Sequence, residues 1–152
     1  QTTGTTLQGE AVNTGIGFAV SINIVKRVVP YLIETGKYDY PYMGISSSST
    51  DLTLTEWKAL GTTQTSGAYV MNVTPGGPAE QAGLRGGTQP TSVNGLYSGG
   101  DIIVAVDGQP VLVYGDVISY IFLHKSPGEK IILTVIRNGE QKEVTLTLGK
   151  RP

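Results

Sequence analysis

The pattern of apolar and polar positions changes about a quarter of the way along the chain. Before that point, apolar side chains recur at helical spacing over residues 24–33. This spacing predicts a helix with Asn23 as its N-cap and Gly36 as its stop, and Pro30 inside the pattern predicts a bend. The apolar run over residues 15–20 predicts a strand just before this helix.

After this helix, shorter apolar runs separated by turn residues predict a β-rich domain. Asp107-Gly108 and Asn138-Gly139 are typical of tight hairpin turns. Thr53 and Glu56 form a capping box at a short helix, in which Trp57 is expected to be a core anchor. A strand is predicted to begin at Ile45 and to lose its regular pattern over residues 46–50. The other predicted strands are 68–73, 101–106, 130–137 and 141–148, and the predicted helices are 53–60, 77–83 and 116–125, the last with Asp116 as its N-cap.

Composition narrows the possible functions. The chain has 152 residues with a net charge of −1, so nothing in its charge favours nucleic acid or an anionic membrane. It has no cysteine, which excludes disulfides and cysteine-based metal or redox sites. No apolar run approaches membrane-spanning length, and no metal or cofactor is expected. Its 21 glycines and 8 prolines indicate many turns around one core.

The segment Tyr42-Met43-Gly44-Ile45 is the first candidate for chemistry. A tight turn that runs directly into a strand can direct consecutive backbone N–H groups into a concavity, which suits an anion. The strand that follows offers an edge to an extended peptide. A carboxylate site beside an open strand edge would capture a peptide C-terminus.

Two further strings carry a resemblance to a known family. Residues 79–84 read AEQAGL, and residues 100–108 read GDIIVAVDG. Together they resemble a PDZ domain, and Tyr42-Met43-Gly44-Ile45 is similar to the carboxylate-binding loop of PDZ domains in HtrA/Deg-type serine proteases. The resemblance implies an α+β, mainly β fold, a PDZ-like β-sandwich or partial barrel with two main helices, preceded by a linker helix.

The resemblance also divides the chain. Residues 1–40 are similar to the C-terminal end of the protease domain and its linker helix, and residues 41–149 form the PDZ domain. The family's protease uses a Ser-His-Asp triad with Gly-Asn-Ser-Gly-Gly around the nucleophile, a string that is absent here. The single histidine, His124, has no nucleophile motif near it, so this chain is not expected to be an enzyme. The parent protein is expected to be a periplasmic or cell-envelope serine endopeptidase.

The resemblance assigns roles to individual residues. The N–H groups of the loop Tyr42, Met43, Gly44 and Ile45 would hold the terminal carboxylate. The strand through Ser46, Ser47 and Ser48 would pair with the peptide. By comparison with other PDZ domains, the groove face of the last helix would comprise Val117, Ile121 and His124, and Val117 would favour an apolar third-last residue in the peptide. The alternative is that Val117 and Ile121 are core residues.

The partners implied are C-terminal or unfolded segments with apolar termini and the protease domain of the parent chain. The groove would recruit misfolded substrates to the protease or regulate it. An alternative is that the groove serves protomer assembly or autoregulation. The 15-residue segment Arg85 to Gly99 is longer than a plain turn between these motifs and is expected to be a surface loop or a contact for a second partner.

Overall fold

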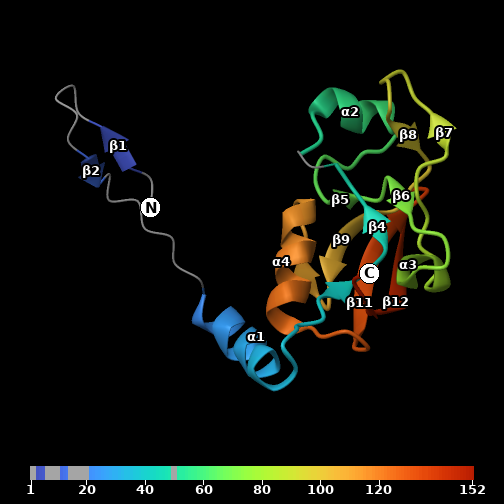
Figure 1. Cartoon of the computed structure of the whole chain (residues 1–152). Coiled ribbons are helices and arrows are strands. Elements are labelled where there is room, and N and C mark those ends of the chain that lie inside the picture. The colour runs from blue at the N-terminus through green and yellow to red at the C-terminus, as the bar shows by residue number, and fades with distance from the viewer. Residues whose placement is uncertain (1–2, 6–10, 14–20, 49–50) are drawn as a thin grey trace. The chain divides into compact units, whose positions relative to one another are not determined.

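The computed structural model describes residues 3–5, 11–13, 21–48 and 51–152 (Figure 1). Two compact units divide the chain, residues 1–38 and residues 39–152. The first unit contains an antiparallel pair of short strands, β1 (Thr3–Thr5) and β2 (Ala11–Asn13), and the helix α1 (Ile22–Thr35). The strand predicted over residues 15–20 lies outside the described residues.

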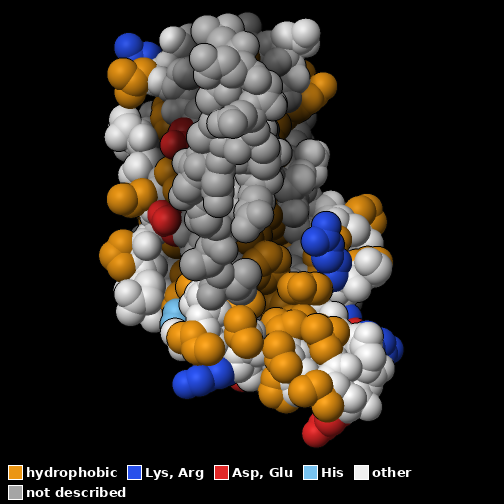
Figure 2. Space-filling view, turned by 60° about the vertical axis from the view of Figure 1, so that its left-hand side comes forward, with side chains coloured by type: hydrophobic (Ala, Val, Ile, Leu, Met, Phe, Trp, Pro, Cys, Tyr) orange, Lys and Arg blue, Asp and Glu red, His pale blue; other side chains and the backbone are white. Residues whose placement is uncertain are grey.

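Helix α1 confirms the helical pattern read from the sequence. It begins two residues earlier than predicted, because Ser21 and not Asn23 is its N-cap, and it continues through Pro30. Gly36 ends it in the left-handed conformation, and its N–H donates to the carbonyl oxygen of Leu32 at 3.1 Å. No α1 residue is buried, and Ile33 is 79% exposed. Figure 2 shows apolar side chains gathered at the surface in the lower part of the view, where α1 lies.

The second unit is built mainly from strands. Strand β9 (Ile102–Val106) lies at the centre of its largest sheet, whose order is β10-β9-β11-β12, with β5 also paired to β9. The remaining strands form three two-stranded pairs, β3–β13, β4–β6 and β7–β8. The strand bounds are β3 Pro41–Tyr42, β4 Ile45–Ser46, β5 Ala68–Tyr69, β6 Asn72–Val73, β7 Gln89–Pro90, β8 Tyr97–Ser98, β10 Gln109–Pro110, β11 Lys130–Arg137, β12 Glu140–Thr147 and β13 Gly149–Lys150.

Three helices complete this unit. They are α2 (Leu54–Ala59), α3 (Pro78–Gln81) and α4 (Tyr114–His124). The predicted capping box of α2 is confirmed, because the Thr53 hydroxyl accepts from the Glu56 N–H while the Glu56 carboxylate accepts from the Thr53 N–H at 2.7 Å. Helix α4 lies along one side of the main sheet, and α2 and the β7–β8 pair lie at one end of it (Figure 1). None of the described helices is long and apolar enough to cross a membrane.

The core lies between α4 and the main sheet. Alternate residues of β11 and β12 face it, as the sequence pattern predicted, and Leu133 and Leu146 are completely buried. A second, smaller cluster under α2 contains Trp57 at 4% exposure, which confirms its role as a core anchor. Both hairpin turns are also confirmed, since Asp107-Gly108 and Asn138-Gly139 each have two consecutive positive φ angles.

Three expectations are corrected by the structure. Residues 68–73 form two short strands, because the chain changes partner between them: β5 pairs with β9 and β6 pairs with β4. Helix α4 begins at Tyr114, so Asp116 is its third residue and not its N-cap; the Asp116 carboxylate instead accepts from the N–H groups of Leu112 at 2.9 Å and Val113 at 3.1 Å. The Arg85 to Gly99 segment contains the β7–β8 pair.

The two ends of the second unit lie side by side. In the β3–β13 pair, Tyr42 is opposite Gly149 and Pro41 is opposite Lys150. The Arg151 N–H donates to the Tyr40 carbonyl oxygen at 3.0 Å. The chain therefore enters and leaves this unit along one antiparallel ribbon.

The carboxylate of Asp107 joins a turn, a helix and a strand. It accepts hydrogen bonds from the Ile132 N–H at 2.7 Å and the Tyr120 hydroxyl at 3.0 Å, and it pairs with the Lys125 ammonium at 2.8 Å. Partial burial alone would raise the pKa of Asp107, but the hydrogen bonds from Lys125, Ile132 and Tyr120 outweigh it and hold the pKa below its usual value. A carboxyl group with a depressed pKa stabilises the folded state above its unfolded-state pKa of about 3.9.

We therefore expect Asp107→Asn to be less stable than the parent chain at pH 7, with a gap that narrows as the pH falls below about 4. Asparagine tolerates the positive φ of this position, so the change removes mainly the charge. Urea unfolding at pH 7, 4 and 3 checks the prediction, with Glu140→Gln as the exposed control. A gap of constant size across this range would contradict it.

Candidate functional site

The loop between β3 and β4 is fixed by its carbonyl groups. The Ala79 N–H donates to the Met43 oxygen at 2.9 Å, and the Thr74 N–H donates to the Gly44 oxygen at 2.8 Å. Gly44 has φ +79°, a conformation that side chains other than glycine rarely adopt. A Cβ atom on Gly44 would lie 3.2 Å from Pro78 Cδ, so the loop packs closely on the start of α3.

Strand β4 has a bonded edge and an open edge. Ile45 lies opposite Val73 of β6, and the carbonyl oxygens on either side of it, those of Gly44 and Ser46, accept from the β6 side. Because backbone groups alternate along a strand, the N–H and carbonyl of Ile45 point to the other edge. Within the described part of the chain, β6 is the single strand that pairs with β4.

A cavity of about 330 Å³ adjoins this open edge. The loop and β4 line one side, α4 lines the other, and the C-terminal segment contributes Arg151. Its lining is mostly apolar or aromatic, and among the described residues Arg151 supplies its single charged side chain. The lining residues are Pro41, Tyr42, Met43, Gly44, Ile45, Tyr114, Ile118, Ile121, Phe122 and Arg151.

Some of the predicted site residues meet at this cavity and others do not. Tyr42, Met43, Gly44, Ile45 and Ile121 line it. Ser46 is exposed on β4, and Ser47 and Ser48 line a neighbouring pocket. Val117 is completely buried in the core, and His124 is exposed with its ring 4.9 Å from that of Tyr120.

The predicted groove face of α4 was therefore displaced by one position. The cavity is lined by Tyr114, Ile118 and Phe122, which are four residues apart and share one helix face. Val117 lies about 100° around the helix from Ile118 and faces the sheet. The apolar side chain of Ile121 lies between the two faces and contributes to both the core and the cavity.

Sequence reasoning missed Tyr114, Ile118, Phe122 and Arg151 as site residues. The helical spacing of the first three was a usable signal, because it defines a second apolar face on the same helix. Arg151 had no such signal. It is far along the chain from the loop and reaches the cavity because β13 pairs with β3.

The polar groups of the cavity are few. The hydroxyls of Tyr42 and Thr74 share a hydrogen bond of 3.0 Å. Burial raises the pKa of the Tyr114 phenol, and the neighbouring Tyr42 adds to the shift, so this ring is neutral at physiological pH. Arg151 has no acidic partner among the described residues. The described residues also contain no group of three side chains suited to a metal ion.

Comparison with known proteins gives concordant results. The sequence profile of the PDZ domain matches residues 41–148. The periplasmic pH-dependent serine endoprotease DegQ of Escherichia coli is 30% identical over 136 residues, which is 90% of this chain and 26% of that protein. A probable periplasmic serine endoprotease, DegP-like, of Chlamydia trachomatis is 31% identical over 138 residues, 91% of this chain and 24% of that protein.

Solved structures agree with these relatives. The HtrA-type protease AlgW with decapeptide is 28% identical, with a TM-score of 0.67, over 97% of this chain and 40% of that one. The chain spans about a quarter of the length of the curated relatives it matches.

Proposed function

Because this chain belongs to the PDZ domain family, we propose that the cavity between β4 and α4 binds the free C-terminus of an extended peptide. The family and the α+β, mainly β fold were both predicted from the sequence, and both are confirmed. The proposal rests on one observation: the open edge of β4 adjoins a mostly apolar cavity in whose described lining Arg151 is the single cation.

The parts of the site have separable roles. The N–H groups of Met43, Gly44 and Ile45 and the guanidinium of Arg151 hold the terminal carboxylate, since charge-assisted hydrogen bonds are stronger than neutral ones. The open edge of β4 (Ile45–Ser46) and the segment that continues to Ser48 pair with the peptide backbone.

Residues of α4 determine which peptide side chains are accepted. Ile118, Ile121 and Phe122 receive an apolar terminal side chain. Tyr114, the first residue of α4, takes the place that Val117 had in the sequence prediction and packs against the third-last peptide residue.

The wider context follows from the relatives, which are periplasmic serine endoproteases. We place this chain in a periplasmic or cell-envelope protein of that kind, with residues 1–40 as the end of the protease domain and its linker helix. The sequence contains no triad motif, so the chain itself would bind and not cleave. Capture of exposed apolar C-termini would deliver misfolded proteins to the protease or regulate it.

A C-terminal peptide library tests this function directly. Purified chain should select peptides with free carboxylates and apolar last residues, and C-terminal amidation should weaken binding about tenfold or more, because charge-assisted bonds contribute about 1.5–3 kcal/mol. Arg151→Gln should weaken binding about two- to fivefold, as expected for one exposed ionic contact. Fluorescence anisotropy gives both values.

The matched control is Arg85→Gln, because Arg85 is exposed and lines neither the cavity nor its neighbour. It should leave binding unchanged. Binding that ignores amidation would remove the carboxylate site and favour the alternative, a module for assembly or autoregulation of the protease.

A further inference from the structure

A second pocket continues the groove beyond the first. Its volume is about 170 Å³, and Tyr114 lines both pockets, so the two are neighbours at the start of α4. The second pocket is more polar than the first, with two serine hydroxyls and one carboxylate. Its lining residues are Ser47, Ser48, Asp51, Leu52, Gly67, Tyr69, Tyr114 and Gly115.

A peptide bound as proposed above would run toward this second pocket. Its carboxylate lies at the β3–β4 loop, and pairing antiparallel to β4 carries the preceding residues past Ser46 toward Ser47 and Ser48. Each residue of an extended strand advances about 3.3 Å. The side chain three or four residues upstream of the terminus is therefore expected near Ser48, at the pocket that Asp51 also lines.

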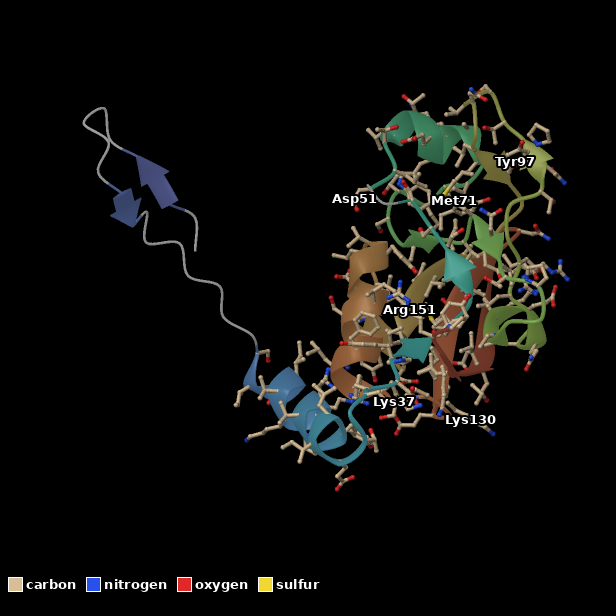
Figure 3. All side chains as sticks on the ribbon, viewed as in Figure 1. Lys37, Asp51, Met71, Tyr97, Lys130 and Arg151 are labelled. Carbon is tan, nitrogen blue, oxygen red and sulfur yellow. The ribbon has the colours of Figure 1, made fainter. Side chains whose placement is uncertain are left out.

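The two pockets carry opposite charges. Of the residues that the structure describes, Arg151 is the single charged one that lines the first pocket, and Asp51 is the single charged one that lines the second. Asp51 is exposed and has no hydrogen-bond or ion-pair partner among the described residues. Figure 3 shows Asp51 above the upper end of α4 and Arg151 farther down, toward β3. The groove therefore carries a positive charge in its first pocket and a negative charge in its second.

We propose that Asp51 forms an upstream subsite that selects a lysine or arginine three or four residues before the free C-terminus. This inference rests on the proposed function and specifies its ligand: a peptide with an apolar end and a basic residue upstream. The ammonium or guanidinium would lie against the Asp51 carboxylate, and the stem of the side chain would pack on the Tyr114 ring.

The test uses fluorescein-labelled heptapeptides that end in Val-Ala-Val with a free carboxylate. They carry Lys, Gln or Glu at the fourth or the fifth position from the end. The unaltered chain should bind the best Lys peptide about two- to fivefold more tightly than its Gln counterpart, and the Glu peptide more weakly still. Raising the salt to 0.5 M should remove most of this difference, because the contact is solvent-exposed.

Variants decide whether Asp51 is responsible. Asp51→Asn should make the Lys and Gln peptides equal, and Asp51→Lys should reverse the order so that the Glu peptide binds best. Glu140→Gln removes an exposed carboxylate that lines neither pocket, and it should leave the preference intact. Equal binding of the three peptides to the unaltered chain would overturn the subsite while leaving the carboxylate site standing. Failure of all free-carboxylate peptides to bind would overturn both.

Discussion

Replacing Asp101 by alanine is expected to lower the free energy of unfolding by about 3–5 kcal/mol, as for other buried ion pairs that lose one partner. The Asp101 side chain is completely buried and accepts hydrogen bonds from the Arg137 Nε and from the Arg85 N–H, at 2.7 Å and 2.9 Å. The second Arg137 nitrogen also bonds this carboxylate and the Gly83 carbonyl oxygen, both at 2.7 Å.

The carboxylate therefore connects β11 to the segment that follows α3. Its removal leaves the Arg137 guanidinium, which is 14% exposed, without a counter-charge. In the unaltered chain the hydrogen bonds with Asp101 raise the pKa of Arg137. Without them the guanidinium still keeps its proton, because arginine is always charged in proteins, so the variant retains an unpaired cation. An N–H group of Arg85 loses its acceptor as well.

Urea unfolding followed by circular dichroism measures this effect. If Asp101→Ala does not fold, Asp101→Asn provides a milder change with the same expected direction. Combining Asp101→Asn with Arg137→Met should cost less than the sum of the two single changes, because the double variant leaves no unpaired buried charge. Glu140→Ala breaks an exposed pair with Lys142 and should cost no more than about 0.5 kcal/mol. A cost below about 1 kcal/mol for Asp101→Ala would contradict the prediction.

Gly44→Ala should weaken the binding of free-carboxylate peptides more than about tenfold while the domain stays folded. Alanine at φ +79° carries strain of about 1–3 kcal/mol, and its Cβ would also lie 3.2 Å from Pro78 Cδ. The backbone strain and the close contact are relieved only by rotating the peptide groups on either side of residue 44. Those groups carry the N–H donors proposed to hold the carboxylate.

A matched control separates this effect from general strain. Gly139 has φ +82°, and a Cβ there would meet no atom within 4 Å. Gly139→Ala should therefore cost similar stability without changing affinity. Anisotropy titrations and thermal melts of both variants give the comparison. Equal affinities for Gly44→Ala and the unaltered chain would show that the loop geometry is not needed for binding.

Local signals explain which features could be predicted from the sequence. The α1 pattern, the α2 capping box and the two hairpin turns depend on residues close together in the chain, and each is found in the structure. The loop from Tyr42 to Ile45 was predictable for the same reason, because its glycine and the strand that follows are adjacent in the sequence. All four of its residues line the cavity. The resemblance to PDZ domains then predicted how these elements are arranged in the fold.

Features that depend on tertiary contacts could not be predicted in this way. Asp116 resembles an N-cap, but its carboxylate acts from the third helical residue on two N–H groups before the helix. Because α4 starts almost one turn earlier than predicted, Tyr114 and not Val117 is its first residue, and Tyr114 lines the cavity. Residues 68–73 form a single apolar run, and the change of partner from β9 to β4 is visible only in the fold.

The antiparallel ribbon of β3 and β13 also has a mechanical consequence. Tension applied through residues 39 and 151 would load the Tyr40–Arg151 hydrogen bond first and then separate the strands one pair at a time, as in unzipping. The core sheet, in which β11 and β12 pair along their full length, would be loaded later. Pro41, Tyr42 and Arg151 also line the cavity, so a pull on the ends of this unit would open the groove before it unfolded the domain.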